Sequence, residues 1–340
     1  LQTWRTVRSQ LMPPAKKAQP DREEREQLLR WIEARVFQLD PENPDPGRVT
    51  IRRLNREEYR NTVRDLLGVD YDTRENFPPD DTGYGFDTIG DVLSLSPLLL
   101  EKYVGAAEEI AGLAMPRDAA KTPESAKTPG DLRQPGKESA KSIMIDGPAP
   151  DGGGARRKYA EKIFRRFAQK AFRRPVDDGT VRRLADMVVA HDAVEGKTFE
   201  DGVRLGVTAV LASPRFLFRA EVQPEADNPS KIVPIDEYAL ASRLSYFLWS
   251  SMPDDELFRL ATQGSLRRNL DAQVERMLAD EKSVRFVRNF TGQWLQARDV
   301  ESVHLNARSI LKVRRLEDAN RIFNFRLRKD MRRETEMVFG

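Results

Sequence analysis

The amino-acid sequence predicts an all-α protein, made of several small helical domains that are joined by linkers rich in proline and glycine. Apolar residues recur at the three- and four-residue spacing of helices along most of the chain. Many of these runs also start at a residue that can cap a helix. The alternating pattern of strands is almost absent, and only residues 142–148 suggest a short strand.

The first 40 residues contain one rigid segment, Met12-Pro13-Pro14. Each proline fixes its own φ, and Pro13 also restricts Met12 to an extended backbone, so the segment holds one thioether sulfur in place. This arrangement suits an axial ligand of a haem iron, although a core methionine that fills a gap is the alternative. A helix is expected next, because Asp21 and Glu24 form a capping box.

The next region begins near residue 49 and is expected to contain two helices. Asn55 and Glu58 form a capping box for the first helix, and Gly68 is placed to end it. Ser96 and Pro97 mark the start of the second helix. A linker rich in Lys, Thr, Pro and Gly then follows.

Two further helical regions follow this linker. Thr198 is expected to cap a helix in the first of them, and Asp236 opens the second. Ser251 is expected to cap the helix that starts near Asp254. Because the chain opens at a leucine and ends within a helical pattern, we expect a fragment truncated at both ends. The predicted domains are residues 1–40, 49–114, 155–222 and 233–340, with a flexible linker at residues 115–154.

The composition excludes several classes of site. The 340 residues include no cysteine, so they cannot form a disulfide, a thiolate metal site or a covalent haem attachment. His191 and His304 are too few for a histidine-rich metal centre. The net charge of +3 gives no overall attraction to nucleic acid. No apolar run approaches the length of a membrane span.

One loop concentrates acidic side chains and glycines. Asp80, Asp81, Asp87 and Asp91 alternate with three glycines within a short stretch. Carboxylates on such a loop are candidate Ca²⁺ ligands, but their spacing does not follow the EF-hand pattern. Turn formation and the capping of helix N-termini explain the same residues. We favour this structural interpretation and keep the four aspartates as a candidate site.

Two other patterns have simple structural explanations. Residues 155–174 carry nine Lys or Arg and a single Glu, which suits an anionic surface but equally a solvated helix face. No base-reading motif accompanies this charge, which argues against nucleic acid as a partner. Ser250 and Ser251 lie near Asp254 and Asp255, yet no nucleophile elbow surrounds either serine. We therefore expect no hydrolytic triad.

Longer stretches resemble a known group of proteins. WRTVRSQLMPPAKKAQPDREEREQLLRWIE is similar to the C-terminal end of the cytochrome c-like domain in planctomycete-type multidomain proteins. RRLNREEYRNTVRDLLGVDYD resembles the domain of unknown function 1587, and GVRLGVTAVLASPRFLFRAE resembles domain 1595. LASRLSYFLWSSMPDDEL resembles domain 1592. The resemblance implies that Met12 is the distal haem-iron ligand and that the haem attachment motif lies upstream of residue 1.

The resemblance also implies a function. It predicts a periplasmic or secreted protein in which haem c of the full-length chain transfers electrons, with an unidentified redox partner or envelope component. This fragment is expected to hold no cofactor by itself, because it has no attachment cysteines. The main alternative is a non-catalytic helical scaffold or partner-binding module, and a nucleic-acid binder is a third hypothesis. Whether the helical domains are catalytic stays open.

Overall fold

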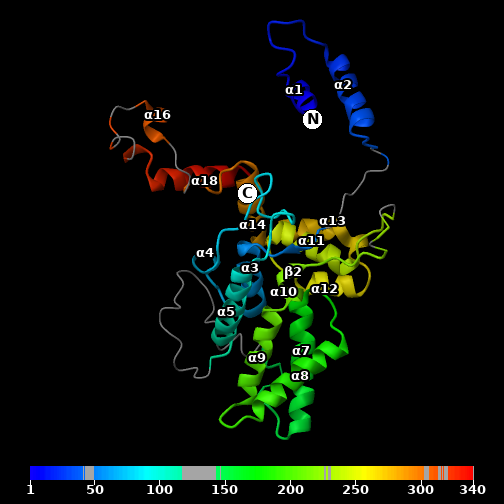
Figure 1. Ribbon diagram of the computed structural model, residues 1–340, viewed down its shortest axis with the longest axis vertical. Helices are drawn as coiled ribbons and strands as arrows, with labels where there is room; N and C mark the ends of the chain where they lie inside the picture. The colour runs from blue at the N-terminus through cyan, green and yellow to red at the C-terminus, as the bar shows by residue number, and fades with distance from the viewer. Residues whose placement is uncertain are drawn as a thin grey trace. The chain divides into compact units, whose positions relative to one another are not determined.

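The computed structural model describes residues 1–40, 42, 50–116, 143–145, 147–225, 227–228, 231–301, 306–312, 315, 317 and 321–339. The chain divides into two compact units. The first comprises Leu1–Val49 with Asn228–Ile232, and the second comprises Thr50–Asp227 with Val233–Gly340. Helices form most of the described residues, whose strands are two short segments (Figure 1). The predicted all-α fold is confirmed.

The first unit is a pair of helices with a very small core. Its elements are α1 (Gln2–Arg8), α2 (Arg22–Trp31) and the π-helical turn η1 (Ile32–Val36). Asp21 caps α2 within a capping box, as predicted. The indole N–H of Trp4 donates to Glu33 Oε1 at 2.9 Å and so joins α1 to η1. Among the described residues of this unit, the buried apolar side chains are Val7 and Ile32.

The second unit begins with capped helices, as the sequence predicts. Its first elements are β1 (Arg52–Arg53), α3 (Arg56–Leu67), α4 (Thr73–Asn76) and α5 (Pro97–Ala114). Asn55 caps α3 and completes the capping box with Glu58. Gly68 ends this helix with a left-handed φ of 70°, which glycine adopts without steric cost. Ser96 caps α5, directly before Pro97 in the first helical position.

Three helices pack against one another in the next part of this unit (Figure 1). They are α7 (Gly153–Phe172), α8 (Asp178–Asp192) and α9 (Phe199–Leu211), followed by α10 (Pro214–Leu217) and β2 (Phe218–Arg219). Thr198 caps α9, as predicted. The strand suggested for residues 142–148 is absent from the described part of that segment. Its apolar run is too short to pair, because Gly147 and Pro148 interrupt it, and Ile143 packs into the core instead.

The last part of the second unit is a series of shorter helices. They are α11 (Glu237–Trp249), α12 (Asp255–Thr262), η3 (Arg267–Asn269), α13 (Leu270–Leu278), η4 (Glu281–Ser283), α14 (Val284–Phe286), η5 (Val287–Thr291), α15 (Gly292–Trp294), α16 (Ala307–Leu311) and α18 (Phe325–Phe339). Asp236 caps α11, as predicted. The prediction that Ser251 caps α12 is wrong, because Asp254 accepts the capping bond from the Leu257 N–H. None of the described helices combines the length and apolar character that a membrane crossing requires.

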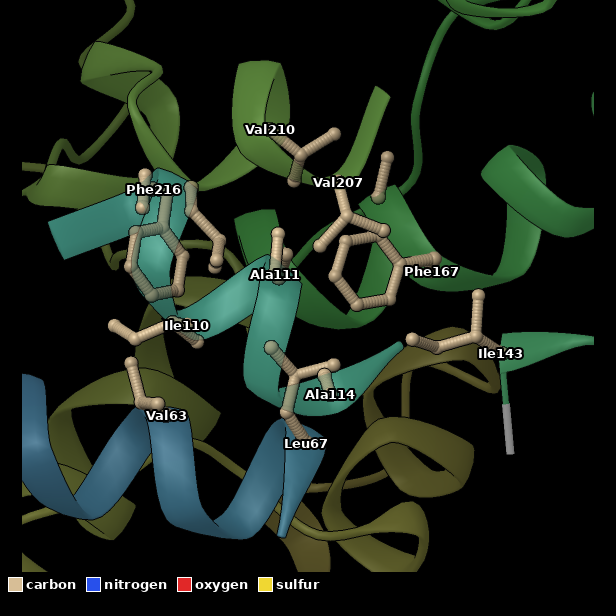
Figure 2. Close-up of a cluster of buried hydrophobic side chains, with 14 of the residues drawn as sticks. Val63, Leu67, Ile110, Ala111, Ala114, Ile143, Phe167, Val207, Val210 and Phe216 are labelled. Carbon is tan, nitrogen blue, oxygen red and sulfur yellow. The ribbon is translucent and has the colours of Figure 1, made fainter. Parts of the chain in front are cut away.

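One buried core joins the three helical regions of this unit. Tyr59 of α3, Phe164 of α7 and Tyr246 of α11 belong to the same cluster of buried apolar side chains. Figure 2 shows how Ile110 of α5 lies between Val63 of α3 and the helix α9. The predicted domain boundaries stay a prediction. The shared core nevertheless means that residues far apart in the sequence pack as one body.

Candidate functional site

The short sheet of the second unit brings two arginines together. Strands β1 and β2 pair antiparallel, with Arg52 directly opposite Arg219. Like charges in such positions repel each other. Glu58 of α3 reduces this repulsion, because Arg52 donates to its two carboxylate oxygens at 2.7 and 2.9 Å. Arg219 Nη1 lies farther away, 3.8 Å from Glu58 Oε1. One buried carboxylate therefore serves two guanidinium groups.

Arg219 is only partly neutralised. Burial lowers the pKa of Arg219 to about 10, and the positive charge of Arg52 acts in the same direction. Burial also disfavours the charged form of Glu58, but the two arginine charges prevail and lower the pKa of this carboxyl. The ring centroid of Tyr246 lies 4.6 Å from the guanidinium carbon of Arg219, within cation–π distance. The site thus keeps a buried cation whose charge is not fully compensated.

Tyr246 itself is fixed by two neighbours. Its hydroxyl lies 3.0 Å from the hydroxyl of Thr62 on α3. Arg173 Nη1 donates to the same hydroxyl at 3.3 Å, and Nη2 donates to the backbone carbonyls of Arg215, Phe216 and Phe218. Arg173 therefore connects the aromatic ring to the segment that carries β2.

Of these groups, Arg52, Glu58, Arg219 and Tyr246 line a pocket of about 530 Å³. This volume lies within the range of roughly 300–1,000 Å³ that is usual for sites of small molecules. The three helical regions of the unit all contribute to its lining. Representative lining residues are Arg52, Glu58 and Phe86 from the first region, Arg219 from the second, and Phe247 and Phe290 from the third.

Aromatic rings form one wall of this pocket. The ring centroid of Phe290 lies 5.9 Å from those of both Phe86 and Phe247. Phe286 stacks on Phe290 at 5.2 Å. Phe247 remains 54% exposed and Phe290 37% exposed, although phenylalanine is usually among the most buried residue types. The wall therefore offers an apolar surface that a ligand in the pocket would cover.

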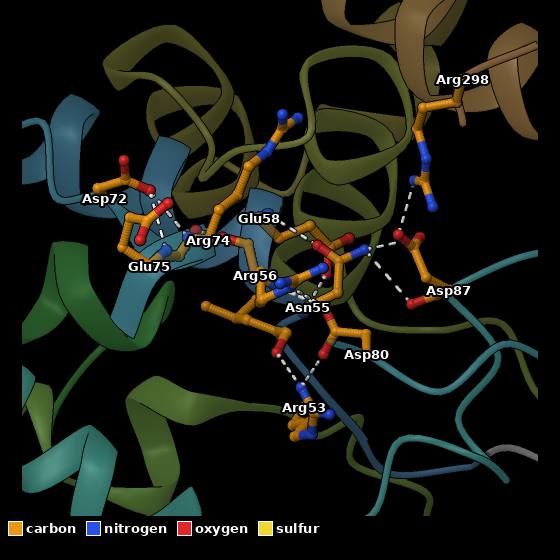
Figure 3. A network of polar contacts seen from close by, with 12 residues as sticks. Arg53, Asn55, Arg56, Glu58, Asp72, Arg74, Glu75, Asp80, Asp87 and Arg298 are labelled. Carbon is orange, nitrogen blue, oxygen red and sulfur yellow. Dashed lines mark hydrogen bonds and ion pairs between the residues drawn. The ribbon is translucent and has the colours of Figure 1, made fainter. Parts of the chain in front are cut away.

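Two of the four candidate loop aspartates form buried ion pairs (Figure 3). Asp80 accepts hydrogen bonds from Arg53 Nη1 and from the backbone N–H of Arg56, both at 2.7 Å. Burial raises the pKa of Asp80, although both of these bonds oppose the shift. Asp87 accepts a bond of 2.7 Å from Arg298 Nη1. These contacts tie the loop to the rest of the unit, and the Arg56 contact supports the N-terminus of α3.

The other two aspartates, Asp81 and Asp91, are exposed. Within the part of the chain that the structure describes, no three His, Cys, Asp or Glu side chains are grouped so that they could hold a metal ion. Asp80 supports a helix N-terminus, as the structural interpretation expects, whereas Asp87 forms an ion pair, and the candidate site itself stays a prediction. Asp87 also lines the pocket, so this loop contributes to the site through ion pairing.

Met12 lies in the first unit, on the segment that follows α1. Its backbone N–H donates to the Thr6 carbonyl at 3.1 Å. The side-chain amide of Gln19 donates to the carbonyls of Pro13 and Pro14 at 3.1 and 2.9 Å. Hydrogen bonds therefore add to the stiffness of the prolines, while Met12 stays 47% exposed. Its role as a haem ligand stays a prediction.

The two serines noted in the sequence bond to partners from other segments of the chain. Ser251 donates to Asp65 Oδ2, and Ser250 accepts from Asn289 Nδ2, both at 2.7 Å. His191 lies on α8. His304 lies outside the described residues. The described bonds of both serines therefore use partners other than histidine.

The basic helix α7 is partly neutralised by its neighbour α8. Arg156 pairs with Asp192 at 2.6 Å, and Arg157 pairs with Asp186 at 2.7 Å. These pairs agree with a structural role for the charged face. The charge pattern therefore gives no support to nucleic acid as a partner.

Apart from Asp87, the sequence patterns did not indicate the charged residues of the pocket. Glu58 was recognised as a capping residue, but its ion pair with Arg52 depends on burial that a sequence does not show. Arg219 follows a short apolar run, and its strand of two residues is too short for an alternating pattern. No local signal could have paired it with Arg52.

The fold and the pocket together define an all-α protein with a charged, partly aromatic pocket. Residues 52–116 match the family model "Protein of unknown function (DUF1587)", residues 159–221 match "Protein of unknown function (DUF1595)", and residues 235–340 match "Protein of unknown function (DUF1592)". The three domains of unknown function that the sequence resembles are thus confirmed. No curated protein and no solved structure matches the chain. The pocket has several lining residues from the first and third matched regions and one, Arg219, from the second.

Proposed function

We propose that residues 50–340 are a binding module that holds a small organic molecule in this pocket. The observation that carries the proposal is the convergence of all three matched regions on one partly aromatic pocket of about 530 Å³. Exposed phenylalanines and an incompletely neutralised arginine are costly features for a fold to keep. A bound molecule would cover the exposed phenylalanine rings and pair with Arg219.

A panel of two-ring aromatic compounds with neutral, anionic or cationic substituents tests this proposal. Binding is followed by NMR with methyl labels on Leu240, Leu244 and Val274, which line the pocket. At least one compound should bind saturably and shift these methyl signals, and Phe290→Ala should weaken it. The exposed Phe325 of α18 does not line the pocket, so Phe325→Ala is the matched control. If no compound binds, or if all shifts lie elsewhere, the binding function is wrong.

Met12 favours a second, linked function. In the full-length protein we infer that its sulfur is the distal axial ligand of a c-type haem, in a planctomycete protein of the periplasm or outside the cell. The exposed sulfur-bearing side chain on a hydrogen-bonded Pro-Pro segment supports this role. The haem would supply one-electron transfer, to or from a redox partner or envelope component that the module binds.

The donors in this chain do not fit haem on their own. Met12 is one thioether ligand, and the sequence has no cysteine to attach a porphyrin. The attachment motif and the proximal ligand would have to come from sequence beyond these residues.

The full-length protein tests this second function. Its visible spectrum should show a c-type haem with the charge-transfer band of methionine bound to ferric iron, and Met12→Ala should abolish that band. Met337 is 71% exposed on α18, so Met337→Ala is the matched control and should leave the spectrum unchanged. Absence of haem, or a spectrum insensitive to Met12→Ala, would contradict the proposal.

A further inference from the structure

We propose that the pocket selects small organic carboxylates with a flat apolar body, and that Arg219 binds the carboxylate group. This inference rests on the proposed binding function and specifies the chemical class of the ligand. It follows from which charges around the pocket already have partners, and from the character of its walls.

Most charged side chains of the lining are matched by a partner at hydrogen-bonding distance. Arg52 forms a two-point pair with Glu58. Arg243 forms a similar pair with Glu221, at 2.6 and 2.7 Å. The carboxylate of Asp87 binds Arg298 at 2.7 Å. These pairs leave little charge for a ligand to complement.

Arg219 differs from these residues. A guanidinium has five N–H donors, yet the polar contacts of Arg219 are long: 3.5 Å from Nη2 to the Ser242 carbonyl and 3.8 Å from Nη1 to Glu58 Oε1. Its buried Nε has no acceptor within hydrogen-bonding distance among the described residues. The side chain is 14% exposed and lines the pocket. An anion that enters the pocket would therefore meet a cation with unused donors.

The geometry of a guanidinium favours a carboxylate. Its planar, forked donors match two carboxylate oxygens, and such a pair is stronger in a partly buried site than in water. Because one lining cation lacks a close counter-charge, a single negative charge balances the site. A phosphate monoester would bring close to two negative charges into the neighbourhood of Glu58 and Asp87. The charge balance thus favours a monoanion.

The walls specify the rest of the ligand. Leu240, Leu244 and Val274 line the pocket together with the exposed rings of Phe247 and Phe290. Aromatic rings bind flat apolar groups by stacking or by edge contacts. A fused or linked ring system that carries one carboxylate would therefore contact the aromatic walls and pair with Arg219.

The probes for the test are 2-naphthoate, its neutral amide 2-naphthamide, and 2-naphthyl phosphate. They share one ring system and differ in charge, so titration calorimetry of the unmodified 340-residue chain isolates the effect of the head group. We expect 2-naphthoate to bind about 10-fold or more tightly than the amide, because one charge-assisted hydrogen-bonded pair contributes a binding free energy of that size. We also expect it to bind more tightly than the phosphate.

Arg219→Gln removes the proposed anchor. This variant should lose the preference for 2-naphthoate over the amide while it still binds the amide. Arg259→Gln is the matched control, because Arg259 is 51% exposed, pairs with Glu256 and does not line the pocket. It removes the same charge from the chain and should keep the preference. Circular dichroism of both variants confirms folding before the titrations.

The outcomes separate this inference from the proposed function. Equal binding of acid and amide by the unmodified chain overturns the carboxylate assignment but leaves the binding function standing. Tighter binding of the phosphate also overturns it. A preference for the acid that survives in Arg219→Gln shows that another residue binds the carboxylate, and overturns the role of Arg219. If none of the three probes binds, the carboxylate inference fails, whereas the binding function fails only if the whole panel of two-ring compounds also fails to bind.

Discussion

Ser251 donates a hydrogen bond of 2.7 Å to Asp65, although 186 residues separate the two in the sequence. Asp65 also pairs with Lys282 at 3.1 Å and with Arg285 at 3.2 Å. The four side chains come from α3, from the turn after α11 and from the segment that leads into η5. One aspartate therefore joins the first matched region to the third.

Asp65→Asn should destabilise the protein strongly. Its carboxylate is largely buried, so the substitution leaves Lys282 and Arg285 without their counter-charge. Breaking a buried pair in this way costs about 3 kcal/mol of unfolding free energy, measured by urea denaturation. Glu256→Gln removes an exposed carboxylate paired with Arg259 and should cost far less than Asp65→Asn. Equal effects of the two substitutions would refute the assigned importance of Asp65.

Acid should unfold the protein partly through the same aspartate. Burial works against its charge, but Arg285 and Lys282 outweigh burial and lower the pKa of Asp65. A lowered pKa means that the stabilisation is complete above the carboxyl pKa of the unfolded chain, near about 4. It is lost as the pH falls through the lower pKa of the folded state. Asp80 makes the opposite contribution. Burial raises its pKa, so its contribution to the unfolding free energy falls as the pH rises from its unfolded-state pKa towards its folded-state pKa.

The measurement is the unfolding free energy of the unmodified chain and of Asp65→Asn between neutral pH and strongly acidic pH. The difference between the two curves isolates Asp65 from the other carboxyl groups. This difference should be constant near neutral pH and shrink in acid. A difference that stays constant over the whole range would mean that Asp65 does not titrate as described.

Gly206 should tolerate no larger side chain. A Cβ at this position of α9 would overlap the ring of Phe164, which is completely buried and cannot move aside. We expect Gly206→Ala to cost about 1–3 kcal/mol in thermal or urea unfolding. Gly105 lies inside α5 with open space around its position, so Gly105→Ala should stabilise by about 0.5–1 kcal/mol. The opposite signs of the two substitutions are the test, and equal signs would contradict the packing.

Glu58→Gln and Arg219→Gln should differ in their effects on stability. Removal of the carboxylate leaves Arg52 opposite Arg219 with no charge between them, and should cost about 3 kcal/mol. Removal of the poorly compensated Arg219 should change the unfolding free energy by less than about 1 kcal/mol, because it also relieves the repulsion from Arg52 across the strand pair. The double variant should be more stable than Glu58→Gln alone. If both single variants are equally destabilised, Arg219 is better neutralised than we infer.

Much of the local structure could be predicted from the sequence. The caps at Asp21, Asn55, Ser96, Thr198 and Asp236 lie where their residue types indicate. A capping bond joins residues two or three positions apart, so the local sequence contains all the atoms that it needs. The cap at Ser251 was predicted wrongly, since a bond to Asp65 from another helix uses its hydroxyl instead.

The ligand roles expected for Met12 and for the four loop aspartates stay predictions, and of these five residues only Asp87 lines the pocket. The loop of Asp80 and Asp87 was noticed for its acidic residues, and the structure shows both carboxylates in ion pairs with arginines. The arginines belong to segments far from the loop in the sequence, so the pairing could not be anticipated. Burial decides whether a carboxylate is a surface group, a structural ion pair or part of a site, and burial depends on the whole fold.

The sequence by itself therefore determined the helical class, most helix starts and the resemblance to three domains of unknown function, because periodicity and capping are local properties. Only the tertiary structure decided that Arg52 faces Arg219, that Glu58 lies between them and that Tyr246 covers the second arginine. These contacts join three distant segments. Their geometry is set by the shared core, which buries the side chains of all three regions at once.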